Sequence, residues 1–177
     1  MTEPFQSRPG VLLEILGQGI LLQGESGVGK SDLALGLVDR GHRLVADDMV
    51  EFYLQAEKLY GRCRLGFEGF IEVTDLGLVN LKRIYDQQAV LDHVPLDLVL
   101  ILEKGRTDEY DHLRPVVSEW QLMGVCVPAW CLPCSDHRNL PLIVETAARL
   151  NRAQRQGYDA SADLQSRLAF LLTEGAV

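Results

Sequence analysis

Apolar residues near the start of the chain cluster into two short runs of strand length. Val11-Leu12-Leu13-Glu14-Ile15 is the first run, and Gly19-Ile20-Leu21-Leu22-Gln23 is the second. Gly17-Gln18-Gly19 joins them, and closely spaced glycines between two apolar runs are typical of a hairpin turn. We therefore expect a pair of antiparallel strands over residues 11–23.

The remaining pattern switches between helical and strand periodicity. A helix is predicted over residues 31–40, where Leu33, Leu37 and Val38 share one face, and Gly41 suits its C-terminal cap. The run from Leu96 to Leu102 is apolar enough for a central strand buried on both faces. Strands are also predicted over 43–46, 50–54 and 58–64, edge strands within 120–134, and helices over 140–155 and 162–172. This order predicts an α/β fold with a central mixed sheet and flanking helices. The length of 177 residues predicts a single domain over 1–177.

The segment between the second strand and the first helix fits the phosphate-binding pattern G-x-x-x-x-G-K-[ST]. Glycines allow the backbone to turn around a polyphosphate, the lysine reaches the β- and γ-phosphates, and the final hydroxyl binds Mg²⁺. The alternative is a glycine-rich turn without a ligand, but the flanking strand and helix favour a site for ATP and Mg²⁺. Its expected binding residues are Gly24, Glu25, Ser26, Gly27, Val28, Gly29, Lys30 and Ser31.

Composition and charge argue against several classes of function. Hydrophobic residues make up 47% of the chain, which is typical of a globular protein. The 17 basic and 25 acidic side chains give a net charge of −8, which disfavours a nucleic-acid-binding surface. No apolar run is long enough for a membrane span, and the first residues do not resemble a signal peptide. We expect a cytoplasmic protein whose partners include neither nucleic acid nor membrane.

Two adjacent carboxylates follow the strand at 43–46 and are the candidate catalytic groups. Phosphoryl transfer needs an acid near the metal and a group that orients or deprotonates the attacking oxygen. We assign Asp47 as the base and Asp48 as the metal-associated acid, and the opposite assignment stays open. Neighbouring strand side chains point to opposite faces, so both acids reach one pocket only where the strand breaks. A turn pair without a catalytic role is the alternative, and Glu103, after the central strand, is another candidate for the metal.

Cys131 and Cys134 have C-x-x-C spacing, which raises zinc binding and redox chemistry as alternatives. Cys126 and His137 could complete a zinc site with four ligands. A second ligand pair at regular spacing is missing, and the cytosol is reducing. We therefore expect reduced structural cysteines.

Residues 24–48, which read GESGVGKSDLALGLVDRGHRLVADD, resemble the HPr kinase/phosphorylase catalytic domain from its P-loop to its acidic pair. The resemblance continues in the same order through residues 69–81, 96–113 and 137–164, and so covers nearly the whole chain. The P-loop begins at residue 24, so we expect the N-terminal domain of the longer family members to be absent. The resemblance implies a central sheet shared with phosphoenolpyruvate carboxykinases.

The resemblance also implies an activity and a set of partners. It implies an enzyme that uses ATP and Mg²⁺ to phosphorylate a serine on HPr, the phosphocarrier of bacterial sugar uptake. Members of the family also run the reverse phosphorolysis and form hexamers. Position by position, Lys30 and Ser31 match the phosphate and Mg²⁺ residues, and Asp47-Asp48 match the pair with the catalytic aspartate. Arg138 matches an arginine that engages the phosphates or the partner.

Several positions depart from the family pattern around the acceptor. Arg64 stands where the family has a metal-associated glutamate, and Gly66 stands where it has an arginine. Glu68 or Glu72 could replace the missing glutamate. His112 takes the place of a further arginine. The nucleotide-binding residues thus match better than the acceptor side.

One departure predicts weak phosphorolysis. Pro9 occupies the position of a family histidine and cannot exchange a proton. A histidine that titrates near neutral pH serves acid–base steps, including activation of an incoming phosphate. We predict that phosphorolysis is weaker than the kinase reaction. Efficient release of phosphate from phospho-HPr that depends on inorganic phosphate would contradict this prediction.

Two other classes of function stay open at this point. The first is a kinase of the same architecture with another acceptor, either a protein or a small molecule. The second is an ATP-binding sensor without phosphoryl transfer. The acidic pair favours an enzyme, whereas the departures at Pro9, Arg64 and Gly66 favour a sensor. Transfer of labelled phosphate onto HPr and onto a cell lysate distinguishes them.

Overall fold

The computed structural model describes residues 4–104, 116–135 and 138–174. His112 and His137 lie outside the described residues. The strands are β1 (Phe5–Pro9), β2 (Val11–Ile15), β3 (Gln18–Gly24), β4 (Arg43–Ala46), β5 (Met49–Gln55), β6 (Lys58–Cys63), β7 (Phe70–Val73), β8 (Gly77–Asn80), β9 (His93–Lys104), β10 (Val116–Leu122) and β11 (Val125–Cys134). The helices are α1 (Lys30–Asp39), α2 (Leu81–Ile84), the 3-10 turn η1 (Gln87–Ala89), α3 (Leu140–Arg155) and α4 (Ala160–Glu174).

Strand β9 organises the main sheet, which has nine strands within the described part of the chain. The order is β1-β5-β6-β9-β3-β2-β4, and β11 also pairs with β9 and carries β10 at its edge. β9 runs parallel to β3 and β11 but antiparallel to β6, so the sheet is mixed. The parallel register pairs Gly24 with Leu102 and Cys134 with Lys104. The carboxyl ends of β3, β9 and β11 therefore meet at one edge, where ligands of α/β sheets commonly bind.

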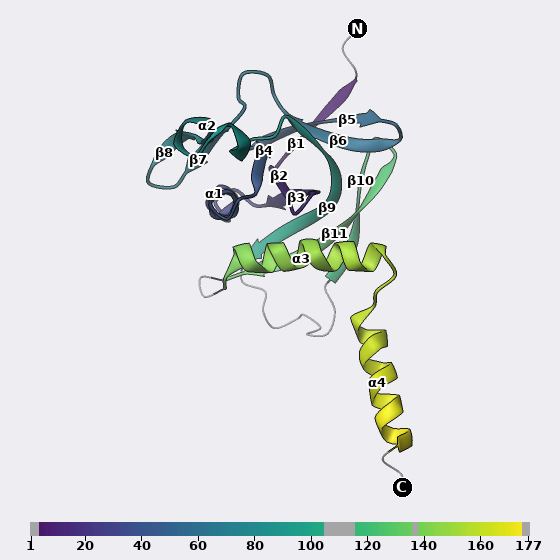
Figure 1. The fold of residues 1–177 in the computed structure, drawn as a ribbon. Helices are drawn as coiled ribbons and strands as arrows, with labels where there is room; N and C mark the ends of the chain where they lie inside the picture. The colour runs from purple at the N-terminus through teal and green to yellow at the C-terminus, as the bar shows by residue number, and fades with distance from the viewer. Residues whose placement is uncertain (1–3, 105–115, 136–137, 175–177) are drawn as a thin grey trace.

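The sheet is buried on both faces, as the run from Leu96 to Leu102 predicts. Leu98, Leu100 and Leu102 of β9 pack in a cluster with residues of α1 and α3. Val99 points to the opposite face and packs in a second cluster with Phe52 of β5. Successive strand side chains alternate between faces, so one strand supplies both clusters. In Figure 1, α3 lies below β9 and β11, and the β5 and β6 strands of the same curved sheet lie above.

The α/β class and most elements expected from the pattern are confirmed. The β2–β3 hairpin, α1, β4, β5, β6, β9 and α3 all form where predicted. Asn139 caps α3 through its side chain, and Gly41 follows α1 with a positive φ of 91°. The pattern did not predict β1 or the separate β7–β8 hairpin. Both are short, and β1 has no buried residue, so it shows no alternation of apolar and polar positions that would indicate a strand.

A buried charged cluster joins the end of α1 to α3. Glu145 of α3 is 6% exposed and accepts two hydrogen bonds from the Arg40 guanidinium, at 2.8 and 2.7 Å. Its Oε1 also lies 3.0 Å from Nε2 of His42, which is itself buried. The hydrogen bonds from Arg40 outweigh burial and lower the pKa of Glu145 to about 2. The cluster fixes α3 against the helix that carries the P-loop.

We predict that Glu145→Gln destabilises the fold in a pH-dependent way. Charge-assisted hydrogen bonds contribute about 1.5–3 kcal/mol, so we expect a loss of about 2–3 kcal/mol near pH 7. The pKa of Glu145 in the folded state, about 2, lies below the ordinary glutamate value of 4.5, so the advantage of the wild type is complete above about pH 5. It shrinks as the pH falls towards 2, and urea unfolding across this range measures it. Asp163→Asn, which breaks an exposed pair on α4, is the control and should leave the midpoint unchanged.

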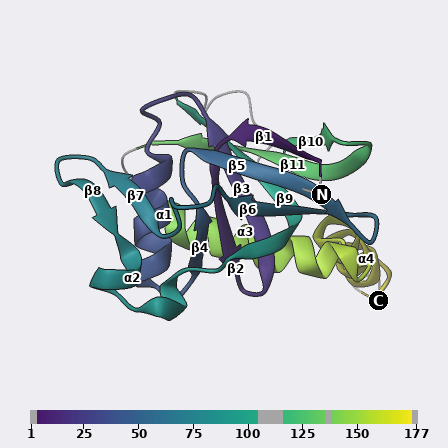
Figure 2. The same cartoon turned by 90° about the horizontal axis from the view of Figure 1, so that it is seen from above.

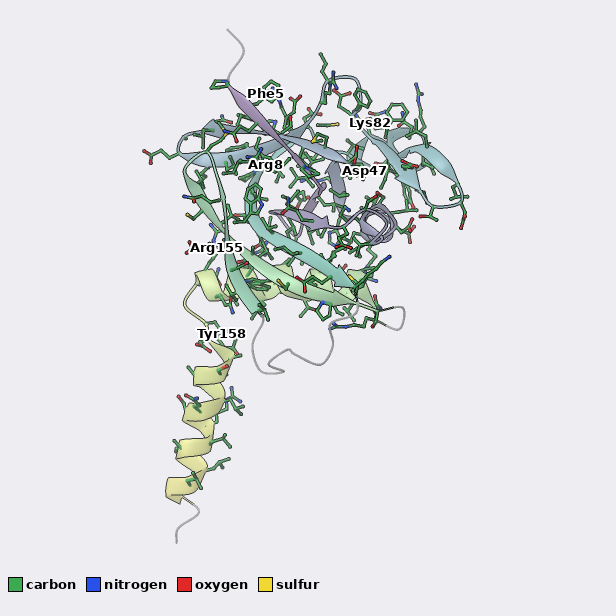
Figure 3. All side chains as sticks on the ribbon, turned by 180° about the vertical axis from the view of Figure 1, so that it is seen from behind. Phe5, Arg8, Asp47, Lys82, Arg155 and Tyr158 are labelled. Atoms are coloured by element: carbon green, nitrogen blue, oxygen red, sulfur yellow. The ribbon has the colours of Figure 1, made fainter. Side chains whose placement is uncertain are left out.

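Helix α4 extends away from the rest of the chain, on the side opposite to α1 and the β7–β8 hairpin (Figures 1 and 2). Tyr158, which lies between α3 and α4, and Arg155, at the end of α3, mark the junction in Figure 3. Leu168 and Phe170 of α4 are more than half exposed. The hexamer implied by the resemblance stays a prediction.

Within the described residues, no helix has the length and apolar character that crossing a membrane requires.

Candidate functional site

The P-loop connects the carboxyl end of β3 to the first turn of α1. Gly24 has a φ of 149°, and a Cβ atom there would lie 2.6 Å from the Leu102 carbonyl of β9. Glycine is therefore required at this position. Gly29 caps α1 with a φ of 93° and provides no side-chain hydrogen bond to the helix. The amides of the first helical turn have no carbonyl one turn earlier, so they are available to an anion.

The lysine of the motif folds across the base of the loop. Lys30 Nζ donates to the carbonyls of Gly24 and Glu25, at 3.0 and 2.9 Å. Val28 is buried and packs in the core, so it anchors the loop. Ser26, Gly27, Gly29, Lys30 and Ser31 line a pocket, whereas Gly24 and Glu25 contribute the carbonyls that hold the lysine. The sequence motif thus separates into lining residues and supporting residues.

The acidic pair lies in the same pocket because the chain leaves the strand direction at this point. Asp48 has a φ of 67°, and the Met49 amide donates to the Asp47 carbonyl at 2.8 Å. This break lets both carboxylates line the pocket, as a joint role of the two acids requires. The Gly10 amide donates to the Asp48 carbonyl at 2.9 Å and supports the turn. Figure 3 shows Asp47 beside α1.

Asp47 and Asp48 have different surroundings. Asp47 accepts hydrogen bonds from Ser31 Oγ and from the Glu72 amide, both at 3.0 Å. Burial raises the pKa of Asp47, and these hydrogen bonds oppose the shift. Asp48 is exposed within the pocket. Ser31 is the hydroxyl expected at Mg²⁺, so its contact favours Asp47 as the metal-associated acid. We therefore propose the reverse of the assignment preferred from sequence, with Asp48 as the base.

The oxygen atoms of this site fit Mg²⁺. Among the described residues, no three His, Cys, Asp or Glu side chains gather closely enough to hold a metal by themselves. Mg²⁺ rarely requires such a cluster, because it binds one or two protein oxygens together with phosphates and water. Ser31 Oγ and the Asp47 carboxylate supply hard oxygen ligands beside the P-loop.

The β7–β8 hairpin forms the wall of the pocket opposite the P-loop. The pocket has a volume of about 760 Å³. Thr74 at the hairpin turn donates from its amide and its hydroxyl to Asp32 of α1, at 3.3 and 3.0 Å. The Glu72 amide bonds to Asp47, so two acids of the nucleotide-binding side hold the hairpin. The hairpin and the loop before it line the pocket with Phe67, Phe70, Ile71, Glu72, Val73, Thr74, Asp75, Gly77 and Leu78.

The sequence did not lead us to predict that the β7–β8 hairpin forms part of the site. A turn signal was available, because Thr74-Asp75-Leu76-Gly77 lies between short apolar runs. Asp75 and Gly77 adopt positive φ angles of 65° and 78° at this turn. No local pattern could show that the hairpin packs beside α1.

Two other predicted residues lie outside the pocket lining. Arg138 is exposed and donates to the Pro133 carbonyl at 3.0 Å, at the end of β11. Glu103 lies in β9 and is not among the lining residues. The structure thus brings the acidic pair, rather than Glu103, to the P-loop hydroxyl. The phosphate-binding role of Arg138 stays a prediction.

Of the positions that depart from the family pattern, Pro9 lies near the acidic pair, whereas Arg64 and Gly66 belong to the loop between β6 and β7. Pro9 of β1 pairs with Met49 of β5, the residue that directly follows Asp48. The position at which the family has a histidine therefore lies close to Asp48. The Arg64 guanidinium lies 5.7 Å from the centre of the Phe67 ring. Glu68 turns back to accept the Gly66 amide, and hydrogen bonds from its own backbone amide and from that of Gly66 lower the pKa of Glu68. Of the two acids considered as replacements, Glu72 lines the pocket and Glu68 does not.

Cys131 and Cys134 both lie in β11. A strand rises about 3.3 Å per residue, so three steps separate the two positions by about 10 Å and place them on opposite faces. A disulfide requires Cα atoms within about 7 Å. The geometry therefore supports structural thiols within the described residues, whereas His137, the proposed fourth zinc ligand, lies outside them.

Comparison with known proteins agrees with the architecture. The family model for the HPr serine kinase C-terminal domain matches residues 3–168. The structure of the HPr(Ser) kinase/phosphatase from Coxiella burnetii is similar with a TM-score of 0.82 and 33% identity. The similarity covers 90% of this chain and 98% of that one.

Curated relatives extend the comparison to longer proteins. The HPr kinase/phosphorylase of Streptococcus agalactiae serotype Ia is 38% identical over 170 residues, which cover 95% of this chain and 55% of that protein. The HPr kinase/phosphorylase of Leptospira biflexa is 37% identical over 178 residues, covering 98% of this chain and 55% of that protein. The chain thus spans about half the length of these relatives. It belongs to the HPr serine kinase C-terminal domain family.

Proposed function

We propose that this chain is the catalytic part of an ATP- and Mg²⁺-dependent kinase that phosphorylates a serine of HPr or a related protein in the cytoplasm. One observation carries the proposal: the P-loop lysine and serine share a pocket with two adjacent carboxylates. Phosphoryl transfer needs this combination of phosphate binding, metal binding and proton acceptance. A sensor would need only the first two.

Each group has a defined task in this reaction. Lys30 and the first-turn amides of α1 bind the β- and γ-phosphates. Ser31 and Asp47 hold Mg²⁺, which neutralises charge on the transferred phosphoryl group when bound. Asp48 takes the proton of the acceptor hydroxyl while the serine oxygen bonds to the γ-phosphorus and ADP departs. The exposure of Asp48 in the pocket leaves it accessible to an incoming side chain.

The surface at the pocket entrance supports a protein acceptor rather than a small molecule. The β7–β8 hairpin and the loop before it carry exposed apolar side chains, which we call the apolar rim: Leu65, Phe67, Phe70, Leu76 and Leu78. Leu65 is 89% exposed, Leu76 73% and Leu78 71%. Phe67, Phe70 and Leu78 also line the pocket, so the rim is continuous with the site. Exposed apolar patches of this kind mark protein–protein contacts, whereas a small acceptor would leave the rim in water.

Transfer of labelled phosphate from ATP tests the proposal. Purified HPr should become labelled in the presence of Mg²⁺, and HPr with alanine at the acceptor serine should not. Labelling of another lysate protein but not HPr would retain the kinase and replace the acceptor. ATP binding without labelling of any protein would overturn the proposal in favour of a sensor or of a kinase with a small-molecule acceptor.

A further inference from the structure

A second lysine contacts the P-loop from the neighbouring strand. Lys104 is the last residue of β9, two positions beyond Leu102, which pairs with Gly24. Its Nζ donates to the Gly27 carbonyl at 2.8 Å. Gly27 lies at the middle of the motif, whereas Lys30 holds the carbonyls at its start. The loop is therefore fastened at two points by two ammonium groups from different elements.

The position of Lys104 follows from the parallel sheet. β3, β9 and β11 end at the same edge, and Lys104 pairs with Cys134 of β11. Burial raises the pKa of the Cys134 thiol, and the charges of Arg138 and Lys104 oppose that shift. Both cations therefore lie near the same thiol, at the edge from which the P-loop leaves β3. In a chain with a net charge of −8, this is a local concentration of positive charge beside the loop.

Lys104 differs from Lys30 in its relation to the pocket. Gly27 and Lys30 line the pocket, but Lys104 does not. Lys104 therefore acts through the loop. Gly27 has a φ of 74°, and nothing lies within 4 Å of a Cβ atom built there. The Gly27 side of the loop is thus open, and the bond from Lys104 restrains a residue that adopts left-handed backbone angles.

We propose that Lys104 is a positioning residue for nucleotide binding, which holds the middle of the P-loop in its phosphate-binding conformation and adds positive charge beside the polyphosphate. This inference rests on the proposed function, because it assumes a nucleoside triphosphate at the P-loop. A loop held in place before binding loses less conformational freedom when the phosphates arrive. An ammonium group near the phosphates also attracts them, and salt screens this attraction.

Titration calorimetry with ATP and Mg²⁺ tests the proposal on three purified variants of the full chain. Lys104→Met keeps the apolar stem but removes the charge and the donor, and we expect ATP to bind about tenfold more weakly. Lys104→Arg keeps both properties and should restore most of the affinity. Lys58→Met makes the same change at the exposed start of β6 and should bind ATP like the wild type. Circular dichroism and thermal unfolding check that each variant is folded.

ATP titrations repeated at several KCl concentrations distinguish a role of Lys104 in phosphate binding from a merely structural role. The affinity of Lys104→Met should fall less steeply with salt than that of the wild type, since one cation is missing. Equal affinity and equal salt dependence in Lys104→Met and the wild type would overturn the inference. So would a loss that Lys104→Arg does not restore. A wild type that binds no ATP would instead refute the proposed function.

Discussion

Asp48→Asn is expected to reduce phosphoryl transfer to the acceptor by about 10²- to 10⁴-fold, the usual contribution of a general base. Asp48 is exposed in the pocket that Ser31 and Asp47 also line. Asparagine keeps the shape of the side chain and tolerates the positive φ of 67° at this position. The substitution therefore removes the proton acceptor without disturbing the turn.

The measurement compares initial rates of transfer with the affinity for ATP. A base acts in the chemical step, so kcat should fall while ATP affinity changes little. Asp92→Asn makes the same change at an exposed position outside the pocket and should leave both unchanged. Asp47→Asn provides a second comparison, since loss of a metal-associated acid should raise the Mg²⁺ concentration required. Equal losses of transfer and ATP affinity in Asp48→Asn would assign Asp48 to ligand binding.

Lys30→Ala is expected to lower kcat/KM for ATP by about 10²- to 10³-fold. Removal of one hydrogen-bond donor that stabilises developing charge in another enzyme gives losses of this size, about 10²- to 10³-fold. Lys30 is the ammonium group that lines the pocket within the P-loop. Its removal also frees the carbonyls of Gly24 and Glu25, which it holds at the base of the loop. Both the phosphate contact and the loop conformation should suffer.

Steady-state kinetics over a range of ATP concentrations measures this loss. The side chain is partly exposed and lies outside the two core clusters, so the unfolding midpoint should stay near that of the wild type. Lys82→Ala removes another partly exposed lysine, which lies in α2 outside the pocket lining, and is the control. If Lys30→Ala keeps both ATP affinity and turnover, the P-loop does not bind a nucleotide in this protein.

The two lysines that contact the P-loop, Lys30 and Lys104, show which parts of the site can be predicted from local sequence and which depend on long-range contacts. Lys30 follows from its motif alone, because eight consecutive residues fix the loop and the start of α1. Lys104 lies 77 positions from Gly27 and belongs to no motif. Parallel pairing of β3 with β9 brings it to the loop. Strand pairing is a long-range property, so no window of the sequence contains the contact.

The acidic pair shows the same division within two residues. The sequence identified Asp47 and Asp48 and the strand break that a joint role requires. It could not order their tasks, because the order depends on which carboxylate meets Ser31. The partner amide of Asp47 comes from Glu72, and the turn at Asp48 is held by Gly10. Both partners are remote in sequence, so the difference between the two acids arises only after folding.

The sequence by itself determined the α/β class, the P-loop and the family, because these reside in local periodicity and in consecutive residues. Tertiary structure alone decided the composition of the pocket. The β7–β8 hairpin, which supplies a wall of the pocket, packs Ile71 and Val73 into the core and is tied to α1 and to the acidic pair by hydrogen bonds to Asp32 and Asp47. These bonds join segments that are 25 and 42 residues apart, and they form only when the sheet has placed α1 beside the hairpin.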